Sequence, residues 1–313
     1  LKAQSENSFE SIAREWQEQN EGRWAHHHAF VVLRSLQREV FPTLGAKPIH
    51  EITAPMILET IKRIAKRDAL EVASRVLQRV SSVIRYAIQT GRATYNPAAD
   101  LVGSLKTRKV THRAALSRAE LPEFLTKLNA YDGHPITRLA MKLMVLTFVR
   151  SSELRGARWE EFDFERAEWR IPAERMKMGT EHIVPLSRQA VAVIEELRPI
   201  TGRYELLFPN RNSLNKPMSE NALIYAMYRM GYHSKATVHG FRATASTILH
   251  ELGFWPDVIE RQLAHAERNS FRAAYRRSEY LEERRRMMQA WADYLDTLAT
   301  GATVIPLREK HAD

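Results

Sequence analysis

The segment "ATVHGFRATASTILHEL", residues 236–252, places His239 three residues before Arg242 at the start of an apolar helical run. Residues three apart on a helix lie on the same face, about one turn from each other. An imidazole can accept a proton near neutral pH, and a guanidinium pairs with two phosphate oxygens at once. The spacing therefore suits phosphate chemistry, although a buried histidine beside a solvated arginine is the simpler alternative.

Further cations follow other elements of the sequence. Arg150 comes directly after the apolar run that ends at Val149, and Glu153 is placed to pair with it or to support the turn through backbone hydrogen bonds. Taken alone, an arginine at such a junction is most often simply exposed. Lys177 precedes a glycine turn at Gly179, from which a long ammonium side chain can reach outward.

Most other catalytic signatures are absent from the sequence. It contains no cysteine, no G-x-x-x-x-G-K-[ST] phosphate loop and no H-E-x-x-H zinc spacing. The consecutive histidines 26–28 cannot all face one way on a helix, and the acidic residues 160–165 suit a solvated turn better than a magnesium site. We expect no metal and no cofactor.

The composition points to a polyanionic partner. The 313 residues carry a formal charge of +10, which favours nucleic acid first and an anionic membrane second. No stretch approaches the roughly 18 apolar residues of a membrane helix. The chain begins without methionine in polar sequence that lacks a signal-peptide core. We therefore expect a fragment or processed chain in the cytoplasm.

Residues 1–105 are predicted to form a small helical domain. Helical periodicity runs through residues 8–20, 24–45, 53–67 and 69–91, with Ser8 and Thr53 as N-caps. The second helix is expected to end before Pro42 and the fourth at Gly91. The exposed cations of this domain are candidates for DNA contact: Lys62, Arg63, Lys66, Arg67, Arg75 and Arg79.

Residues 106–116 are predicted to form a basic linker. Its cations Lys106, Arg108, Lys109 and Arg113 suit contact with phosphates as well as they suit a solvated loop.

Residues 117–300 are predicted to form the second domain, which starts with a helix capped by Ser117. Two strand-like runs, 168–171 and 182–185, flank the Gly179 turn, and the chain is helical again from Ser187. Residues 301–313 are expected to be a flexible tail. The fold class is mainly α with a small antiparallel sheet.

Four segments, in this order, resemble the tyrosine recombinases of the phage integrase family, and within it the P4-type integrases of prophages and genomic islands. They are "LTFVRSSELRGARWEEFDF", "MKMGTEHIVPLS", "VHGFRATASTIL" and "LAHAERNSFRAAYRRSEYLEERRRMMQAWADYL". The resemblance runs from about Ser8 to Leu295, although "GTE" after Met178 is less basic than the pattern. It implies a SAM-like core-binding domain and a mixed α/β catalytic domain in a C-shaped clamp, without the N-terminal arm-binding domain.

The resemblance also implies roles for individual residues. Arg150 and Arg242 would clamp the scissile phosphate, supported by Glu153. His239 would be the general base, Lys177 the general acid and His265 a hydrogen-bond donor to the phosphate. Tyr275 would be the nucleophile that forms a 3′-phosphotyrosyl link, with Tyr280 as the alternative. The residues that carry this assignment are Arg150, Lys177, His239, Arg242, His265 and Tyr275.

The implied function is site-specific DNA recombination without metal or ATP. The implied partners are duplex attachment sites and three further copies of the chain, which would form a synaptic tetramer on the DNA. The free protein would be a monomer. The implied location is the nucleoid in the bacterial cytoplasm. An excisionase or a DNA-bending helper is a further candidate partner. A non-catalytic DNA-binding regulator and a type IB topoisomerase are the alternatives. The apolar face of residues 287–295 suits either its own core or a neighbouring subunit.

Overall fold

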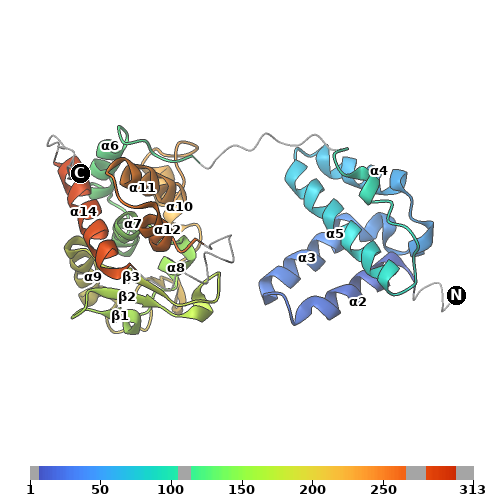
Figure 1. Cartoon of the computed structure of the whole chain (residues 1–313), viewed down its shortest axis with the longest axis horizontal. Coiled ribbons are helices and arrows are strands. Elements are labelled where there is room, and N and C mark those ends of the chain that lie inside the picture. Colours follow the sequence, from blue (N-terminus) through green and yellow to red (C-terminus); the bar gives the residue numbers. More distant parts are fainter. Residues whose placement is uncertain (1–6, 105–113, 266–279, 301–313) are drawn as a thin grey trace, which may run out of the picture. The chain divides into compact units, whose positions relative to one another are not determined.

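The computed structural model describes residues 7–104, 114–265 and 280–300 (Figure 1). The chain divides into two compact units, Leu1–Thr111 and His112–Asp313, and the division falls within the predicted linker. Several predictions lie outside the described residues: the linker cations Lys106, Arg108, Lys109 and Arg113, the nucleophile Tyr275 and the tail 301–313.

The N-terminal unit contains the four predicted helices. They are α2 (Phe9–Glu21), α3 (His26–Glu39), α4 (Ala54–Ala65) and α5 (Leu70–Gln89). The Ser8 hydroxyl accepts a hydrogen bond from Ser11 N at 3.3 Å and so caps α2 as predicted. Thr53 occupies the N-cap position of α4, but its side chain makes no capping bond. Short helical turns at Phe41–Gly45, Ile49–Glu51 and Ala99–Leu101 complete the unit.

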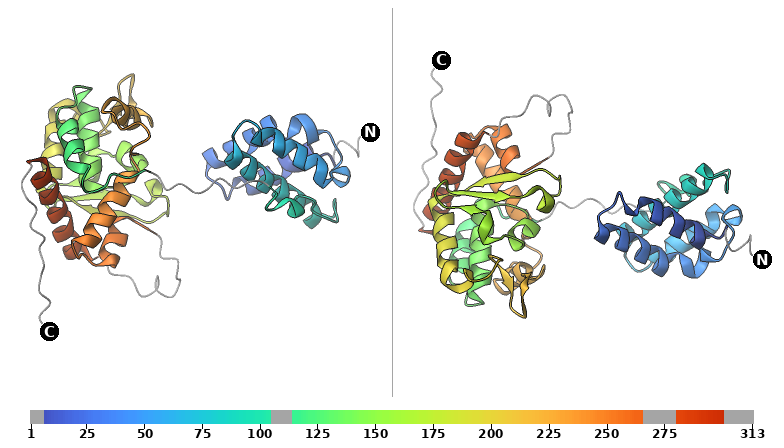
Figure 2. Two further views of the ribbon diagram at one scale, coloured as in Figure 1. Left: turned by 90° about the horizontal axis from the view of Figure 1, so that it is seen from above. Right: turned by 90° about the horizontal axis from the view of Figure 1, so that it is seen from below.

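The C-terminal unit combines helices with a small sheet (Figure 2). Strands β1 (Phe162–Asp163), β2 (Glu168–Ile171) and β3 (His182–Pro185) pair antiparallel in that order. The predicted bounds of β2 and β3 are confirmed. The helices are α6 (Leu121–Asn129), α7 (Pro135–Thr147), α8 (Ser151–Arg155), α9 (Arg188–Thr201), α10 (Ala222–Arg229), α11 (Gly240–Glu251), α12 (Pro256–Gln262) and α14 (Leu281–Ala299).

The structure corrects two predictions in this unit. A second hairpin, β4 (Pro209–Asn210) and β5 (Ser213–Pro217), occupies part of the region expected to be helical. Four of the five residues of β5 are exposed, so the strand carries no alternating apolar pattern that the sequence could reveal. The helix expected after Ser117 begins only at Leu121, because the Glu120 carboxylate accepts from both Ser117 N and Oγ and closes a turn before the helix.

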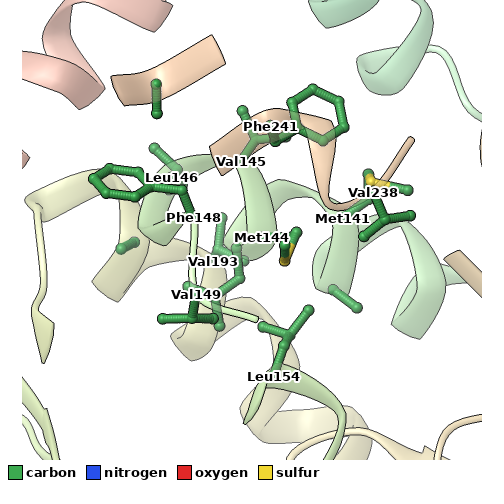
Figure 3. Close-up of a cluster of buried hydrophobic side chains, with 14 of the residues drawn as sticks. Met141, Met144, Val145, Leu146, Phe148, Val149, Leu154, Val193, Val238 and Phe241 are labelled. Carbon is green, nitrogen blue, oxygen red and sulfur yellow. The ribbon is translucent and has the colours of Figure 1, made fainter. Parts of the chain in front are cut away.

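The core of this unit surrounds α7, which packs against α6, α8, α9, α10 and α14. Figure 3 shows the part of the core behind the candidate site, where side chains of α7 meet those of α8, α9 and the start of α11. Each side chain in this cluster is less than a tenth exposed: Met141, Met144, Val145, Leu146, Phe148, Val149, Leu154, Val193, Val238 and Phe241.

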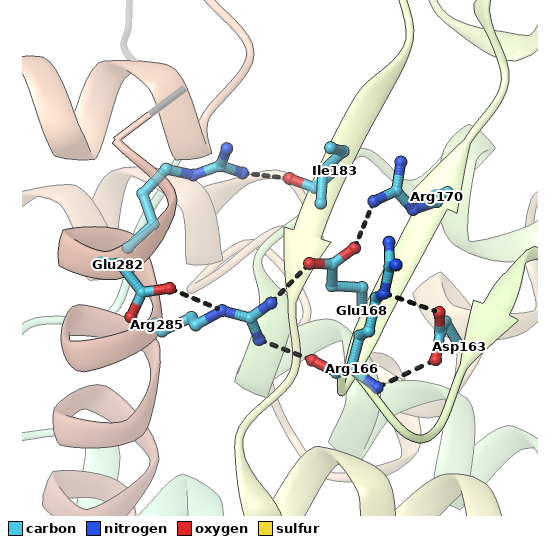
Figure 4. Close-up of polar contacts among 8 residues, drawn as sticks. Asp163, Arg166, Glu168, Arg170, Ile183, Glu282 and Arg285 are labelled. Carbon is cyan, nitrogen blue, oxygen red and sulfur yellow. Dashed lines mark hydrogen bonds and ion pairs between the residues drawn. The ribbon is translucent and has the colours of Figure 1, made fainter. Parts of the chain in front are cut away.

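Helix α14 packs on the core of its own chain. The sequence did not show whether its apolar face packs on its own core or on a neighbouring subunit. In the structure this face is buried within the chain, and Trp291 Nε1 donates to Val145 O at 3.0 Å. Arginines then attach α14 to the sheet (Figure 4). Arg285 donates to Glu168 Oε1 at 2.5 Å and to Arg166 O at 2.6 Å, and Arg284 donates to Ile183 O. The helix is therefore an integral part of this unit.

No helix within the described ranges has both the length and the apolar character to cross a lipid bilayer. Three of the four acidic residues of the predicted solvated turn, Glu160, Glu161 and Asp163, are paired with arginines, and Glu165 is exposed. Glu161 is buried and accepts from Arg175, while Asp163 pairs with Arg166 at 3.7 Å. Among the described residues, no group of three or more histidines and acidic side chains is arranged to hold a metal ion.

Candidate active site

Arg150 is held at a sharp change of chain direction. Helix α7 ends with Phe148 in the left-handed region, at a φ of 41°, and α8 begins directly after Arg150. The buried side chains of Phe148 and Val149 anchor this junction in the core (Figure 3). The apolar run before Arg150 therefore gives the arginine a rigid support.

Glu153 makes both of the contacts that the sequence suggested as alternatives. One carboxylate oxygen accepts from Arg150 N at 2.8 Å and the other accepts from Arg150 Nη1 at 2.7 Å. The carboxylate is 2% exposed and the Arg150 side chain 18%. A buried ion pair with charge-assisted hydrogen bonds has few alternative geometries, so Glu153 fixes the direction of the guanidinium.

Arg242 lies in the first turn of α11 and is almost completely buried, with 4% of its surface exposed. Its Nη1 donates to Phe148 O at 2.8 Å, and its Nη2 donates to Leu263 O. Burial, and then the nearby charge of Arg150, lowers the pKa of Arg242 to about 10. The side chain therefore remains a cation at neutral pH.

The two arginines converge on the end of α12. Arg242 Nη2 binds Leu263 O, and Arg150 Nη2 donates to the next carbonyl along the chain, Ala264 O, at 3.0 Å. His265 follows immediately, and its Nδ1 lies 2.7 Å from Glu260 Oε2. The structure thus brings together three of the predicted site residues, Arg150, Arg242 and His265.

His239 and Lys177 have more exposed positions. His239 is the N-cap residue of α11, and it lines a cavity of about 380 Å³ together with Ser151, the residue after Arg150. Lys177 is exposed on the segment between β2 and β3, near Gly179 with its φ of 65°. Within the described ranges, no hydrogen bond or ion pair holds the Lys177 ammonium, so its reach toward the arginines stays a prediction.

Gly240 allows α11 to begin next to another part of the backbone. A Cβ at this position would lie 2.3 Å from Ala114 O, which is closer than any side chain tolerates. Ala114 O also accepts from Thr237 N at 3.0 Å. Only glycine therefore allows this close approach, which sets the position of His239 and Arg242 on either side.

A buried polar network behind the arginines was not found from the sequence. Gln262 donates its amide to Thr147 O at 3.5 Å, accepts from Arg284 Nε at 3.1 Å, and has its main-chain carbonyl 3.1 Å from His182 Nε2. Burial lowers the pKa of His182 to about 3, with the charge of Arg284 as the next cause, so the imidazole is neutral. These contacts hold the end of α12 against α7, β3 and α14. Of the residues in this network, only Thr147 lies within an apolar run of the sequence, so the local pattern did not mark the others.

The predicted DNA-contacting cations of the N-terminal unit differ in their availability. Lys62 and Lys66 are exposed on and after α4. The four arginines have partners within the protein: Arg63 with Glu39 O, Arg67 with the Glu39 carboxylate, Arg75 with Glu71 and Arg79 with the Ser35 hydroxyl. The sequence could not show the partners of Arg63, Arg67 and Arg79, because Glu39 and Ser35 come from a different helix. Arg75 and Glu71 are four residues apart on α5.

Comparison with known proteins identifies the family of this chain. Residues 9–104 match the phage integrase central domain, and residues 114–282 match the phage integrase family. The chain is 49% identical to the integrase of Enterobacteria phage P4, over 94% of this chain and 71% of that protein. The chain belongs to the phage integrase family. The P4-type resemblance is confirmed, and the protein is a site-specific recombinase of the integrase type rather than a non-catalytic regulator.

Other relatives agree with this assignment. The prophage integrase IntA of Escherichia coli K12 is 36% identical over 96% of this chain and 72% of its own length. Among solved structures, a lambda integrase tetramer bound to a Holliday junction matches with a TM-score of 0.69 and 17% identity, over 86% of this chain and 81% of that one. Lambda integrase residues 75–356 bound to DNA match with a TM-score of 0.65 and 16% identity, over 87% and 97%. At these identities the structures establish the integrase fold.

Proposed function

We propose that this integrase cuts DNA by attack of Tyr275 on a phosphodiester held by Arg150 and Arg242. The anchoring of both guanidiniums on the successive carbonyls of Leu263 and Ala264 carries the proposal. Two cations fixed close together in a largely buried site are suited to the extra negative charge of a pentacoordinate phosphorane. A site that merely bound DNA would not need this burial and fixed direction.

The proposed reaction conserves the energy of the phosphodiester. The Tyr275 oxygen attacks phosphorus while His239 takes the phenol proton, and the bond from phosphorus to the 5′ oxygen breaks. Lys177 gives a proton to the departing 5′ oxygen, and His265 donates a hydrogen bond to the phosphate. A 3′-phosphotyrosine results, and the 5′ hydroxyl of another strand reverses the step. Neither ATP nor a metal ion is consumed in this sequence.

The structure supports Tyr275 over Tyr280 as the nucleophile through the position of Tyr280. Tyr280 has a φ of 44° at the start of α14, is half-buried and packs against the hydrophobic core. Its main-chain carbonyl also accepts from Arg284 N at 2.8 Å. A residue held in this way suits a packing role, which favours Tyr275 as the proposed nucleophile.

The proposed substrate is a pair of duplex attachment sites, and the proposed active assembly is a homotetramer that forms from monomers. The fold neighbours support this, since they include an integrase tetramer on a Holliday junction and an integrase bound to DNA. Exposed Lys62 and Lys66 would contact phosphates, as would the linker cations Lys106, Arg108, Lys109 and Arg113. An excisionase or DNA-bending helper is part of the proposed assembly, which would act at the nucleoid in the bacterial cytoplasm.

Covalent trapping tests the reaction. The chain would be incubated with a pool of nicked duplexes of randomised sequence, from which adduct-forming molecules are recovered on a denaturing gel and sequenced. A nick close to the cleavage site lets the short fragment that carries the new 5′ hydroxyl diffuse away, so the protein remains attached through the 3′ phosphate. We expect an adduct with the wild type and none with Tyr275→Phe, while both bind the selected duplex equally. An adduct that survives Tyr275→Phe and disappears in Tyr280→Phe would contradict the assignment.

A further inference from the structure

Two left-handed residues supply carbonyls that hold the two arginines. Phe148, with a φ of 41°, ends α7 and accepts from Arg242 Nη1 at 2.8 Å. Ala264, with a φ of 48°, follows α12 and accepts from Arg150 Nη2 at 3.0 Å. L-residues rarely adopt this conformation because their Cβ crowds the neighbouring carbonyl, and glycine is the usual choice. Strain of this kind is retained where the surrounding structure imposes it, often at functional sites.

Ala264 occupies the glycine position of a helix-ending motif. Ala264 N donates to Arg261 O at 3.1 Å, and His265 N donates to Glu260 O at 3.2 Å. These two bonds define a Schellman turn, in which the left-handed residue is most often glycine. Leu263 and Ala264 follow the last residue of α12, and their carbonyls bind Arg242 and Arg150 respectively.

We propose that Ala264 is a positioning residue for the Arg150–Arg242 pair, acting through its left-handed backbone. The inference rests on the proposed function, because it assumes that both guanidiniums bind the reacting phosphate. A guanidinium has five N–H donors. Arg150 uses one for Glu153 and one for Ala264, and Arg242 uses one for Phe148 and one for Leu263. The anchors therefore fix the direction of each arginine and leave donors for phosphate.

The same turn also sets the position of His265. His265 follows Ala264 directly, and its Nδ1 contacts Glu260, which lies on the preceding helix. A change in the backbone at Ala264 would therefore move two arginine anchors and the imidazole together. The Ala264 methyl packs at the edge of the hydrophobic core, whereas the contact with Arg150 is made by the main-chain carbonyl, so the proposed role belongs to the backbone conformation.

Three variants separate this role from a general effect of strain. Ala264→Val places a β-branched residue at a φ of 48°, where it is strongly disfavoured. Ala264→Gly adopts the same turn freely. Ala167→Val is the matched control, because Ala167 has a φ of 50° in the turn between β1 and β2, where its carbonyl accepts from Leu186 N at 2.8 Å. Ala264→Leu, which lacks the branch at Cβ, provides a second disruptive change should valine prevent folding.

The measurements are the single-turnover rate of adduct formation on a selected nicked duplex, the affinity for that duplex and the melting temperature. We expect Ala264→Val to lower the rate by about 10²-fold with unchanged affinity, since small misplacements of positioning groups have effects of this size. Ala264→Gly and Ala167→Val should keep the wild-type rate. Equal rates for Ala264→Val and Ala167→Val, or a large loss in Ala264→Gly, would overturn the inference. Absence of any adduct with the wild type would instead refute the proposed function.

Discussion

The Ala264 carbonyl accepts a hydrogen bond from Arg150 Nη2 at 3.0 Å, across 114 residues of sequence. The neighbouring Leu263 carbonyl binds Arg242 in the same way. Arginines that are expected to hold a phosphate are thus first held by the protein's own main chain. This arrangement aligns two like charges before DNA arrives, and the reaction then requires less reorganisation of the site.

Replacing Arg242 with lysine should remove most of the catalytic rate. Lysine keeps the positive charge, but it lacks the planar fork that reaches Phe148 O and Leu263 O together. We expect adduct formation by Arg242→Lys to slow by about 10²-fold or more, which is the usual effect of losing one donor to a developing charge. Arg188→Lys, on an 81% exposed side chain, is the control and should react normally. A normal rate for Arg242→Lys would exclude the proposed clamp.

His182 should make the protein less stable in acid. Its folded-state pKa is about 3, mainly because of burial, against an ordinary value of 6.5. The unfolded chain therefore binds a proton that the folded chain does not, and the free energy of unfolding should fall by about 1.4 kcal/mol per pH unit below about 6.5. Urea denaturation from about pH 7 to about pH 5 should show a shallower decline in His182→Gln, whose amide can still donate to Gln262 O. If the free energy of unfolding fell equally with pH in the wild type and in His182→Gln, the result would contradict a buried neutral imidazole.

Gly240→Ala should damage the start of α11. The added Cβ would meet Ala114 O at 2.3 Å, and a backbone atom cannot move aside as a flexible side chain can. We expect a loss of about 2 kcal/mol in the free energy of unfolding, within the range for overpacking, together with slower adduct formation. Gly22→Ala is the matched control, since nothing lies within 4 Å of its added Cβ. If both variants unfold at the same urea concentration, the close approach to Ala114 is not a constraint.

Glu168→Gln should loosen α14 from the sheet (Figure 4). The carboxylate is 2% exposed and accepts from Arg285 at 2.5 Å and Arg170 at 2.6 Å. Loss of its charge weakens two charge-assisted hydrogen bonds, with an expected decrease of about 2 kcal/mol in the free energy of unfolding. Exposed Glu165→Gln should change stability by less than about 0.5 kcal/mol. Chemical denaturation compares the two, and equal midpoints would show that Glu168 does not fasten the helix.

Sequence patterns predicted the helices and strands that have one apolar and one polar face. Helices α2 to α5 have a periodic apolar face, and strands β2 and β3 flank a glycine turn, so their positions follow from local periodicity. Hairpin β4–β5 was missed because β5 lies mostly at the surface and has no such face. Arg150, His239 and Arg242 could also be predicted as site residues from the sequence, because each lies in a family motif directly after an apolar residue. These apolar residues, Val149, Val238 and Phe241, are buried.

By itself, the sequence determined the family, the helical architecture and which side chains are chemically suited to a phosphate. The tertiary structure alone decided how those side chains are held: by the carbonyls of Phe148, Leu263 and Ala264, and by the space that Gly240 leaves for Ala114 O. Every residue carries the same main-chain carbonyl, so the residue types do not show which carbonyls accept a hydrogen bond from an arginine. Their role arises only when the backbone folds and distant segments come within hydrogen-bonding distance.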